Sequence, residues 1–275
     1  RKDSPRYYGC LRINGKYYRK SLDTQDHGEA ISIVLEWNEQ KKIEISESLK
    51  ESKQNSQKLN TEYRLDDKYS LDKGRVFLTG TQALVRLPII QRKIDQDNGI
   101  NTACYISGYT GSPLGGYDHA LNQASDFLDE NEIVFQPGIN EDLAATALHG
   151  SQQTTLVDKP KYDGVFGIWY GKGPGVDRSG DALKHGNYAG TSKYGGVLAL
   201  AGDDHGAKSS TTAHQSDHAF IHFGMPILNP ATVQDYLDFG VLGFAMSRYS
   251  GCWVGFKCVT DTVESAASVD ISLDR

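Results

Sequence analysis

Two segments of the chain combine residue types that could do chemistry. Glu141 follows Asn140 at the predicted start of a helix, and a glycine-rich turn, residues 107–116 (SGYTGSPLGG), precedes it in the sequence. An acid at a helix start is favoured by the helix dipole, so Glu141 could have only that role. A desolvated carboxyl group instead has a raised pKa and can share a proton with a ligand. Ser112 in the turn could likewise cap a helix or bind a ligand.

Both segments follow short apolar runs that predict buried strands. From residue 75 onward such runs alternate with helical stretches, and the predicted strands are 102–107, 133–136, 164–170, 197–202, 226–228 and 253–259. Alternation on this scale predicts an α/β fold with a doubly wound, mostly parallel sheet. Ligands bind such sheets at the carboxyl ends of the strands, where both segments lie.

A further polar group follows the predicted strand 197–202. It contains Asp203, Asp204 and His205, and His214 and His218 come soon after. Histidines four residues apart share one face of a helix, which suggests a metal site. However, no glutamate lies between them as in the H-E-x-x-H motif, and polar residues are common where strands end. We therefore expect no metal at this site.

The sequence also argues against several other kinds of site. Residues 108–113 lack the G-x-G-x-x-G dinucleotide fingerprint, residues 171–175 lack P-loop spacing, and no G-x-S-x-G elbow occurs. The four cysteines form no C-x-x-C pair, so this stretch cannot assemble a zinc ribbon or an iron–sulfur cluster. No apolar run approaches the roughly 18 residues of a membrane span. We expect a cytoplasmic protein.

The distribution of charge indicates two units. The first 60 residues carry 12 Lys+Arg against 9 Asp+Glu, whereas the rest of the chain is acidic. Residues 6–45 predict a strand, a turn at Asn14-Gly15, a second strand and a helix capped by Asp26. We expect a small β-β-α module at 1–47, a polar segment at 48–62 that is a linker or the end of an exposed helix, and an α/β domain at 63–275.

Several stretches of the larger unit together resemble one enzyme family. They are residues 69–88 (YSLDKGRVFLTGTQALVRLP), the turn 107–116, NEDLAATALHGSQQ (140–153), GKGPGVDRSGD (171–181), AGDDH (201–205) and SRYSGCW (247–253). In this order they resemble the pyrimidine-side domain of thiamine-diphosphate-dependent 2-oxoacid:ferredoxin oxidoreductases, and most closely the fused indolepyruvate ferredoxin oxidoreductases. The resemblance covers residues 63–275 and implies that the domain continues beyond Arg275.

The resemblance assigns roles to single residues. It implies that Glu141 is the catalytic group and hydrogen-bonds a ring nitrogen of the thiamine aminopyrimidine. Gly111 and Ser112 are expected to lie against the cofactor. Ser112 is also expected to contact the substrate together with Thr110, which stands where the family usually has proline. The remaining implied substrate contacts are Asp204 and His205.

The resemblance also implies a reaction and its partners. The reaction is oxidative decarboxylation of an aryl 2-oxoacid to its acyl-CoA, with ferredoxin as the electron acceptor. The implied cofactors are thiamine diphosphate with Mg, and iron–sulfur clusters. This stretch lacks both a G-D-G…N diphosphate motif and cysteine-rich cluster ligands, so further domains of the same enzyme or a partner subunit must supply them. We expect a homo-oligomer.

Residues 1–50 carry a second resemblance, to the N-terminal DNA-binding module of phage-type tyrosine recombinases. Seven basic residues and one acid precede Ser21, a balance that suits contacts with phosphates. A solvated hairpin without a partner would have the same composition, because Lys and Arg are ordinary surface residues. DNA binding by residues 1–47 and this simpler role both remain open.

Overall fold

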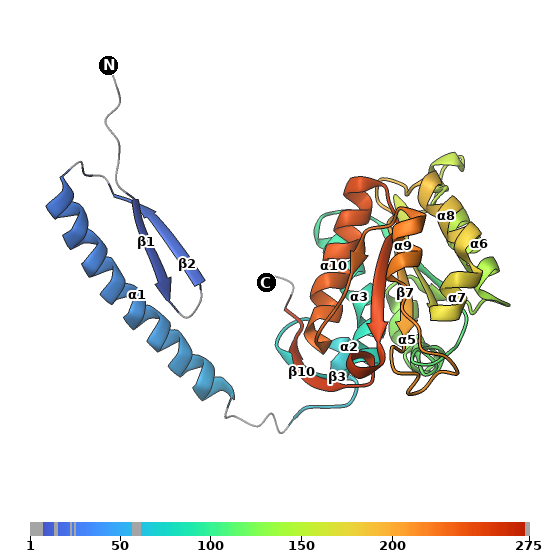
Figure 1. Ribbon diagram of the computed structural model, residues 1–275, viewed down its shortest axis with the longest axis horizontal. Helices are drawn as coiled ribbons and strands as arrows, with labels where there is room; N and C mark the ends of the chain where they lie inside the picture. The colour runs from blue at the N-terminus through green and yellow to red at the C-terminus, as the bar shows by residue number, and fades with distance from the viewer. Residues whose placement is uncertain (1–7, 14–15, 23, 25, 57–61, 273–275) are drawn as a thin grey trace, which may run out of the picture. The chain divides into compact units, whose positions relative to one another are not determined.

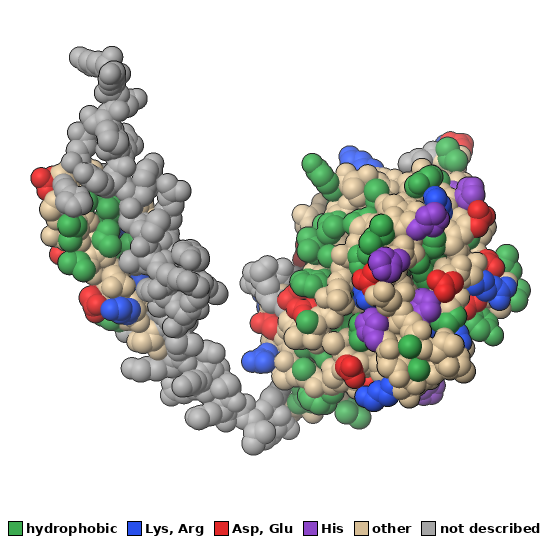
Figure 2. Space-filling model, viewed as in Figure 1, with side chains coloured by type: hydrophobic (Ala, Val, Ile, Leu, Met, Phe, Trp, Pro, Cys, Tyr) green, Lys and Arg blue, Asp and Glu red, His purple; other side chains and the backbone are tan. Residues whose placement is uncertain are grey.

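The chain divides into two compact units, residues 1–63 and 64–275 (Figure 1 and Figure 2). The computed structural model describes residues 8–13, 16–22, 24, 26–56 and 62–272. None of the helices in these ranges combines the length and the apolar character needed to span a bilayer.

The N-terminal unit begins with a pair of antiparallel strands. Ile13 lies opposite Lys16, so two residues connect the strands. The turn predicted at Asn14-Gly15 lies outside the described residues. The strands are β1 (Tyr8–Ile13) and β2 (Lys16–Ser21).

A long helix, α1 (His27–Ser56), completes this unit. It begins beside Asp26, whose Oδ1 accepts a hydrogen bond from the Glu29 amide at 2.8 Å and caps the helix as predicted. The helix continues through residues 48–56, which belong to the polar segment expected to be a linker or a helix end. Residues 57–61 of that segment lie outside the described residues. DNA binding by this unit stays a prediction.

The larger unit is built on a six-stranded parallel sheet with the order β5-β4-β6-β7-β9-β8. The strands are β4 (Thr102–Gly108), β5 (Ile133–Phe135), β6 (Gly164–Lys172), β7 (Val197–Asp203), β8 (Ile227–Leu228) and β9 (Val254–Val259). A separate antiparallel pair consists of β3 (Arg75–Thr79) and β10 (Ala266–Asp270). The predicted doubly wound, mostly parallel α/β fold is confirmed.

Helices cover both faces of the sheet (Figure 1). Helix α3 packs against α4 and α10 on one face, while α6 packs against α7 and α8 on the other, with α9 beside α8. These helices are α3 (Gly80–Asp97), α4 (Tyr117–Gln123), α6 (Glu141–Ser151), α7 (Gly173–Arg178), α8 (Gly180–Ala189), α9 (Asp217–Phe223) and α10 (Val233–Ser250). The short helices are α2 (Asp67–Ser70), α5 (Ser125–Glu130), η1 (Thr154–Leu156) and α11 (Thr260–Val263).

Two local expectations need correction. The sequence predicts one helix over residues 113–129, but the structure has α4 and α5, which meet at Ala124. The sequence G-P-G at residues 173–175 predicts a turn, but these residues form the first turn of α7. Pro174 suits this position because the first turn of a helix does not need its amide hydrogen.

The core lies between the sheet and its two helical layers. Every residue of β7 is buried, because a parallel sheet covered on both faces has no solvated side. Trp169 on β6 and Trp253 before β9 are fully buried in an apolar cluster with residues of α6 and α8. This packing holds the ends of β6 and β7 in place, where the polar residues follow.

The direction of the strand order reverses between β4 and β6. After β4 the chain enters α4 on one face of the sheet, and after β6 it enters α7 and α8 on the other face. Open α/β sheets bind ligands outside the carboxyl ends of their strands at such a switch point. The glycine-rich turn after β4 and the start of α7 therefore mark the place to look for a site.

Candidate functional site

Glu141 stands at the start of α6, beside this switch point. The helix begins here because Asn140 Oδ1 accepts a hydrogen bond from the Leu143 amide at 2.9 Å. Trp169 Nε1 donates to the backbone oxygen of Glu141 at 3.0 Å, which ties the helix start to β6. Glu141 is only 6% exposed, so it is not a solvated surface acid.

The Glu141 side chain occupies space that two glycines leave open. A Cβ atom at position 175 would lie 2.7 Å from Glu141 Oε1, and one at position 171 would lie 3.5 Å from its Cγ. Within the described part of the chain, the Glu141 carboxylate forms no hydrogen bond or ion pair. Buried polar groups normally have partners, and one without a partner points to a catalytic role or to a bound water, ion or ligand. The carboxylate is therefore available to a bound molecule.

The glycine-rich turn packs against the end of β6. A Cβ atom at position 111 would lie 2.9 Å from Lys172 Cδ, so Gly111 lets the lysine side chain cross close to the turn. Thr110 Oγ1 donates a hydrogen bond to the Gly115 carbonyl at 3.2 Å. The Thr110 hydroxyl thus has a partner inside the turn, while contact between Thr110 and a substrate stays a prediction.

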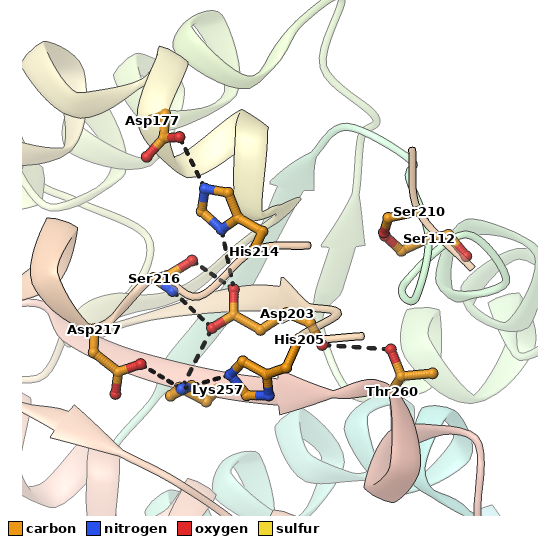
Figure 3. Close-up of polar contacts among 10 residues, drawn as sticks. All are labelled: Ser112, Asp177, Asp203, His205, Ser210, His214, Ser216, Asp217, Lys257 and Thr260. Carbon is orange, nitrogen blue, oxygen red and sulfur yellow. Dashed lines mark hydrogen bonds and ion pairs between the residues drawn. The ribbon is translucent and has the colours of Figure 1, made fainter. Parts of the chain in front are cut away.

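Ser112 joins the turn to the loop that follows β7. Its carbonyl oxygen accepts a hydrogen bond from Ser210 Oγ at 3.2 Å. Figure 3 shows this pair beside the polar cluster described below. Among the described residues, the Ser112 hydroxyl itself forms no hydrogen bond, so it can serve a ligand.

Asp204 holds the loop after β7 together. Its carboxylate accepts hydrogen bonds from the backbone amides of Ser209 at 2.6 Å, Lys208 at 2.9 Å and Ser210 at 2.8 Å. These amides, with Ser209 contributing most, lower the pKa of Asp204 from 3.8 to about 2. The carboxylate faces its own loop, so the structure shows a loop-holding group, and direct substrate contact by Asp204 stays a prediction.

A buried cluster of charged residues lies at the ends of β7 and β9 (Figure 3). Lys257 on β9 forms ion pairs with Asp203 on β7, at 3.5 Å, and with Asp217 at the start of α9. Asp203 also accepts hydrogen bonds from the Ser216 amide at 2.8 Å and hydroxyl at 2.7 Å. Because Asp203 and Lys257 are buried, each charge depends on the other for compensation.

The same cluster brings together residue types that bind metals. Donor atoms of Asp203, His205 and Asp217 all lie within 4.8 Å of one another. The Lys257 ammonium contacts all three residues, with Nζ 3.5 Å from His205 Nε2. The chain thus supplies the cation for these donors, and Lys257 would have to move before a metal could bind. His205, an expected substrate contact, is exposed beside this ammonium.

His214 links the cluster to the surface. Its Nε2 lies 2.8 Å from Oδ2 of the exposed Asp177, and its Nδ1 lies 3.7 Å from Asp203 Oδ1. The suggestion that His214 and His218 share one helical face is wrong, because α9 begins at Asp217 and His214 precedes it. That arrangement was the basis of the metal hypothesis for the two histidines.

Three charged residues at this edge of the sheet carry little signal in the sequence. Lys257 has the strongest, because a charge inside the apolar strand VGFKCV indicates a buried partner. Asp217 is an acid at a helix start and Lys172 is a lysine at a strand end. Acids are common at helix starts and lysines are common at strand ends, so the sequence does not distinguish Asp217 and Lys172 from surface residues. Only their contacts in the folded chain place them at the site.

Comparison with known proteins identifies a solved structure with the same fold. No protein-family model and no curated protein matches the sequence. A solved structure that matches is the 2-oxoglutarate:ferredoxin oxidoreductase from Magnetococcus marinus with 2-oxoglutarate, coenzyme A and succinyl-CoA bound. The TM-score is 0.52 at 13% sequence identity. The two proteins share a fold. The match covers 72% of this chain and 31% of that oxidoreductase, so the chain spans only part of the enzyme's length.

Proposed function

We propose that residues 63–275 are the pyrimidine-side domain of a thiamine-diphosphate-dependent 2-oxoacid:ferredoxin oxidoreductase. One observation carries the proposal: a buried carboxylate without a protein partner, Glu141, stands at the switch point of the sheet and packs against Gly175. The fold shared with a 2-oxoglutarate:ferredoxin oxidoreductase supports it. So does the order of the sequence stretches that resemble this family.

The residues present fit the aminopyrimidine of thiamine diphosphate. Glu141 has an unpartnered carboxylate on a buried residue, which suits sharing a proton with a ring nitrogen. Gly111 lies in the glycine-rich turn at the same switch point, and the Ser112 hydroxyl forms no hydrogen bond among the described residues. The cofactor, when bound, supplies the nucleophilic carbon and accepts the negative charge released by decarboxylation. The chain contributes the proton-sharing group and the positioning of the substrate.

Part of the site must come from elsewhere in this proposal. Exposed apolar side chains lie in the segments next to Glu141, with Tyr109 43%, Ile139 84% and Leu143 53% exposed. Exposed apolar side chains near a functional group suit a protein interface. We assign this surface to the domain or partner subunit that carries the diphosphate and Mg site, in a homo-oligomeric assembly. The iron–sulfur clusters and ferredoxin contact likewise belong outside this stretch.

The finer assignment is an aryl 2-oxoacid, with indolepyruvate as the candidate substrate and an acyl-CoA as product. It rests on the sequence stretches, which resemble the indolepyruvate enzymes more than other branches of the family. The test is turnover by the complete enzyme with coenzyme A and ferredoxin, comparing indolepyruvate with 2-oxoglutarate and pyruvate. Preference for indolepyruvate is expected. Activity on 2-oxoglutarate alone would keep the reaction class and replace the substrate, whereas no activity on any 2-oxoacid would reject the proposal.

A further inference from the structure

Lys172 ends β6, the strand that forms one side of the switch point. Its side chain is half-buried and crosses the glycine-rich turn, since Cδ and Cγ would lie 2.9 Å and 3.1 Å from a Cβ atom at position 111. The preceding residue, Gly171, packs against the Glu141 side chain. The Lys172 side chain therefore lies against the turn that contains Ser112, and the residue before Lys172 lies against Glu141.

Lys172 differs from the other cations at this edge of the sheet in its lack of a partner. In the part of the chain that the structure describes, its ammonium forms no ion pair or hydrogen bond. The neighbouring lysines and arginines all pair with carboxylates: Lys257 with Asp203 and Asp217, Lys208 with Asp261, and Arg178 with Asp142. The stem of Lys172 is packed while its ammonium has no protein anion, so the ammonium is available to an anionic ligand.

We propose that Lys172 is the counter-ion for the carboxylate of the 2-oxoacid substrate, a role that rests on the proposed function. A 2-oxoacid placed at this switch point brings a second negative charge close to the Glu141 carboxylate. Like charges repel strongly where water is excluded, so a nearby cation is needed. Lys172 supplies that cation, and the Ser112 hydroxyl can donate a further hydrogen bond. Contact with the turn holds the lysine stem in advance, which lowers the entropy cost of binding.

Lys172 could act through the charge of its ammonium or through the packing of its stem, and the two roles have different consequences. Lysine stems often cover apolar surface while the ammonium stays in water, and Lys172 could have only that role. A role in packing would affect charged and neutral ligands alike. A counter-ion discriminates between them, because only the carboxylate gains a charge-assisted hydrogen bond.

The test uses the complete enzyme with indolepyruvate and its methyl ester, which keeps the carbon skeleton and removes the charge. Lys172→Met and Lys172→Gln both remove the cation but differ in polarity. Thermal melting identifies which of the two variants is folded and can be assayed. We expect the KM for indolepyruvate to rise about 10- to 150-fold, since a hydrogen bond to a charged group is worth about 1.5 to 3 kcal/mol. The inhibition constant of the ester should change less than about threefold on the same basis, and Lys172→Arg should retain most of the discrimination.

Lys208→Met is the matched control, because Lys208 is an exposed lysine at the same edge that already pairs with Asp261. It should change neither constant. If the neutral Lys172 variants weaken acid and ester equally, or weaken neither, the counter-ion role is overturned while the proposed function stands. If the wild-type enzyme turns over no 2-oxoacid, the proposed function itself fails.

Discussion

Gly175 lies so close to Glu141 that any larger residue would meet the carboxylate. A Cβ atom at position 175 would be 2.7 Å from Glu141 Oε1 and 2.8 Å from its Cγ. Real side chains essentially never approach so closely, so one of the two residues would have to shift. The glycine of α7 therefore sets the position of the carboxylate on α6.

This contact predicts that Gly175→Ala lowers both stability and turnover, whereas a glycine with open space around it tolerates alanine. Alanine normally stabilises a helix by up to about 1 kcal/mol relative to glycine, but here overpacking costs about 1 to 3 kcal/mol. We expect turnover of the complete enzyme to fall at least about 10-fold, since a misplacement of about 1 Å at a reacting group can cost about 100-fold in rate. Gly150→Ala on α6 is the control, because no atom lies within 4 Å of its new Cβ. Equal turnover of the two variants would contradict the steric argument.

Glu141→Gln tests the proton-sharing role. The amide keeps the size of the carboxyl group but cannot exchange a proton in the same way, so turnover should fall about 100- to 10,000-fold. Exchange of the thiazolium proton of bound cofactor with deuterium should slow, while the melting temperature changes little. Asp142→Asn is the matched control, since Asp142 is the next residue and pairs with Arg178 at the surface. Normal proton exchange in Glu141→Gln would leave Glu141 with no more than a helix-dipole role.

Lys257→Met should destabilise the fold strongly. It leaves the carboxylates of Asp203 and Asp217 close together without a cation, and breaking a buried pair costs about 3 to 5 kcal/mol. Lys208→Met removes an exposed lysine that pairs with an exposed acid, so it should cost less than about 1 kcal/mol. Urea unfolding at neutral pH compares the two variants. Similar free energies of unfolding would show that the buried cluster is not held by its charges.

The lowered pKa of Asp204 predicts that the stability of the fold depends on pH. Its pKa is about 2 in the folded protein, below the ordinary 3.8, because amides of its loop bind the charged form. Asp204 therefore stabilises the fold fully above about pH 4, and this contribution is lost as the pH falls through about 2.

The experiment is urea unfolding of the wild type and Asp204→Asn from pH 5 to pH 2. The variant should be less stable at pH 5, and the difference should narrow as the wild-type carboxylate is protonated. Asp261→Asn controls for loss of an exposed acid on the same side of the molecule. A difference that stays constant with pH would mean that the charge of Asp204 does not hold the loop.

Local sequence signals determined much of the fold and the first site residue. Apolar runs of strand length alternated with helical periods, and this alone predicted the parallel sheet now seen in β4, β6, β7 and β9. Asn140 marked the start of α6, so Glu141 could be placed at the end of a strand connection. These signals work because hydrogen bonding and side-chain periodicity within one segment are local properties.

The partners of the charged residues were decided only by the tertiary structure. Asp203 and Lys257 are far apart in the sequence, and they meet because β7 and β9 pair although β8 lies between them in the chain. Asp204 resembles a ligand-binding acid in the sequence, but the fold of its loop turns the carboxylate toward amides. Lys172 is an ordinary lysine until the strand order places it over Gly111. Strand order depends on how the whole chain buries its apolar faces, so no single segment contains it.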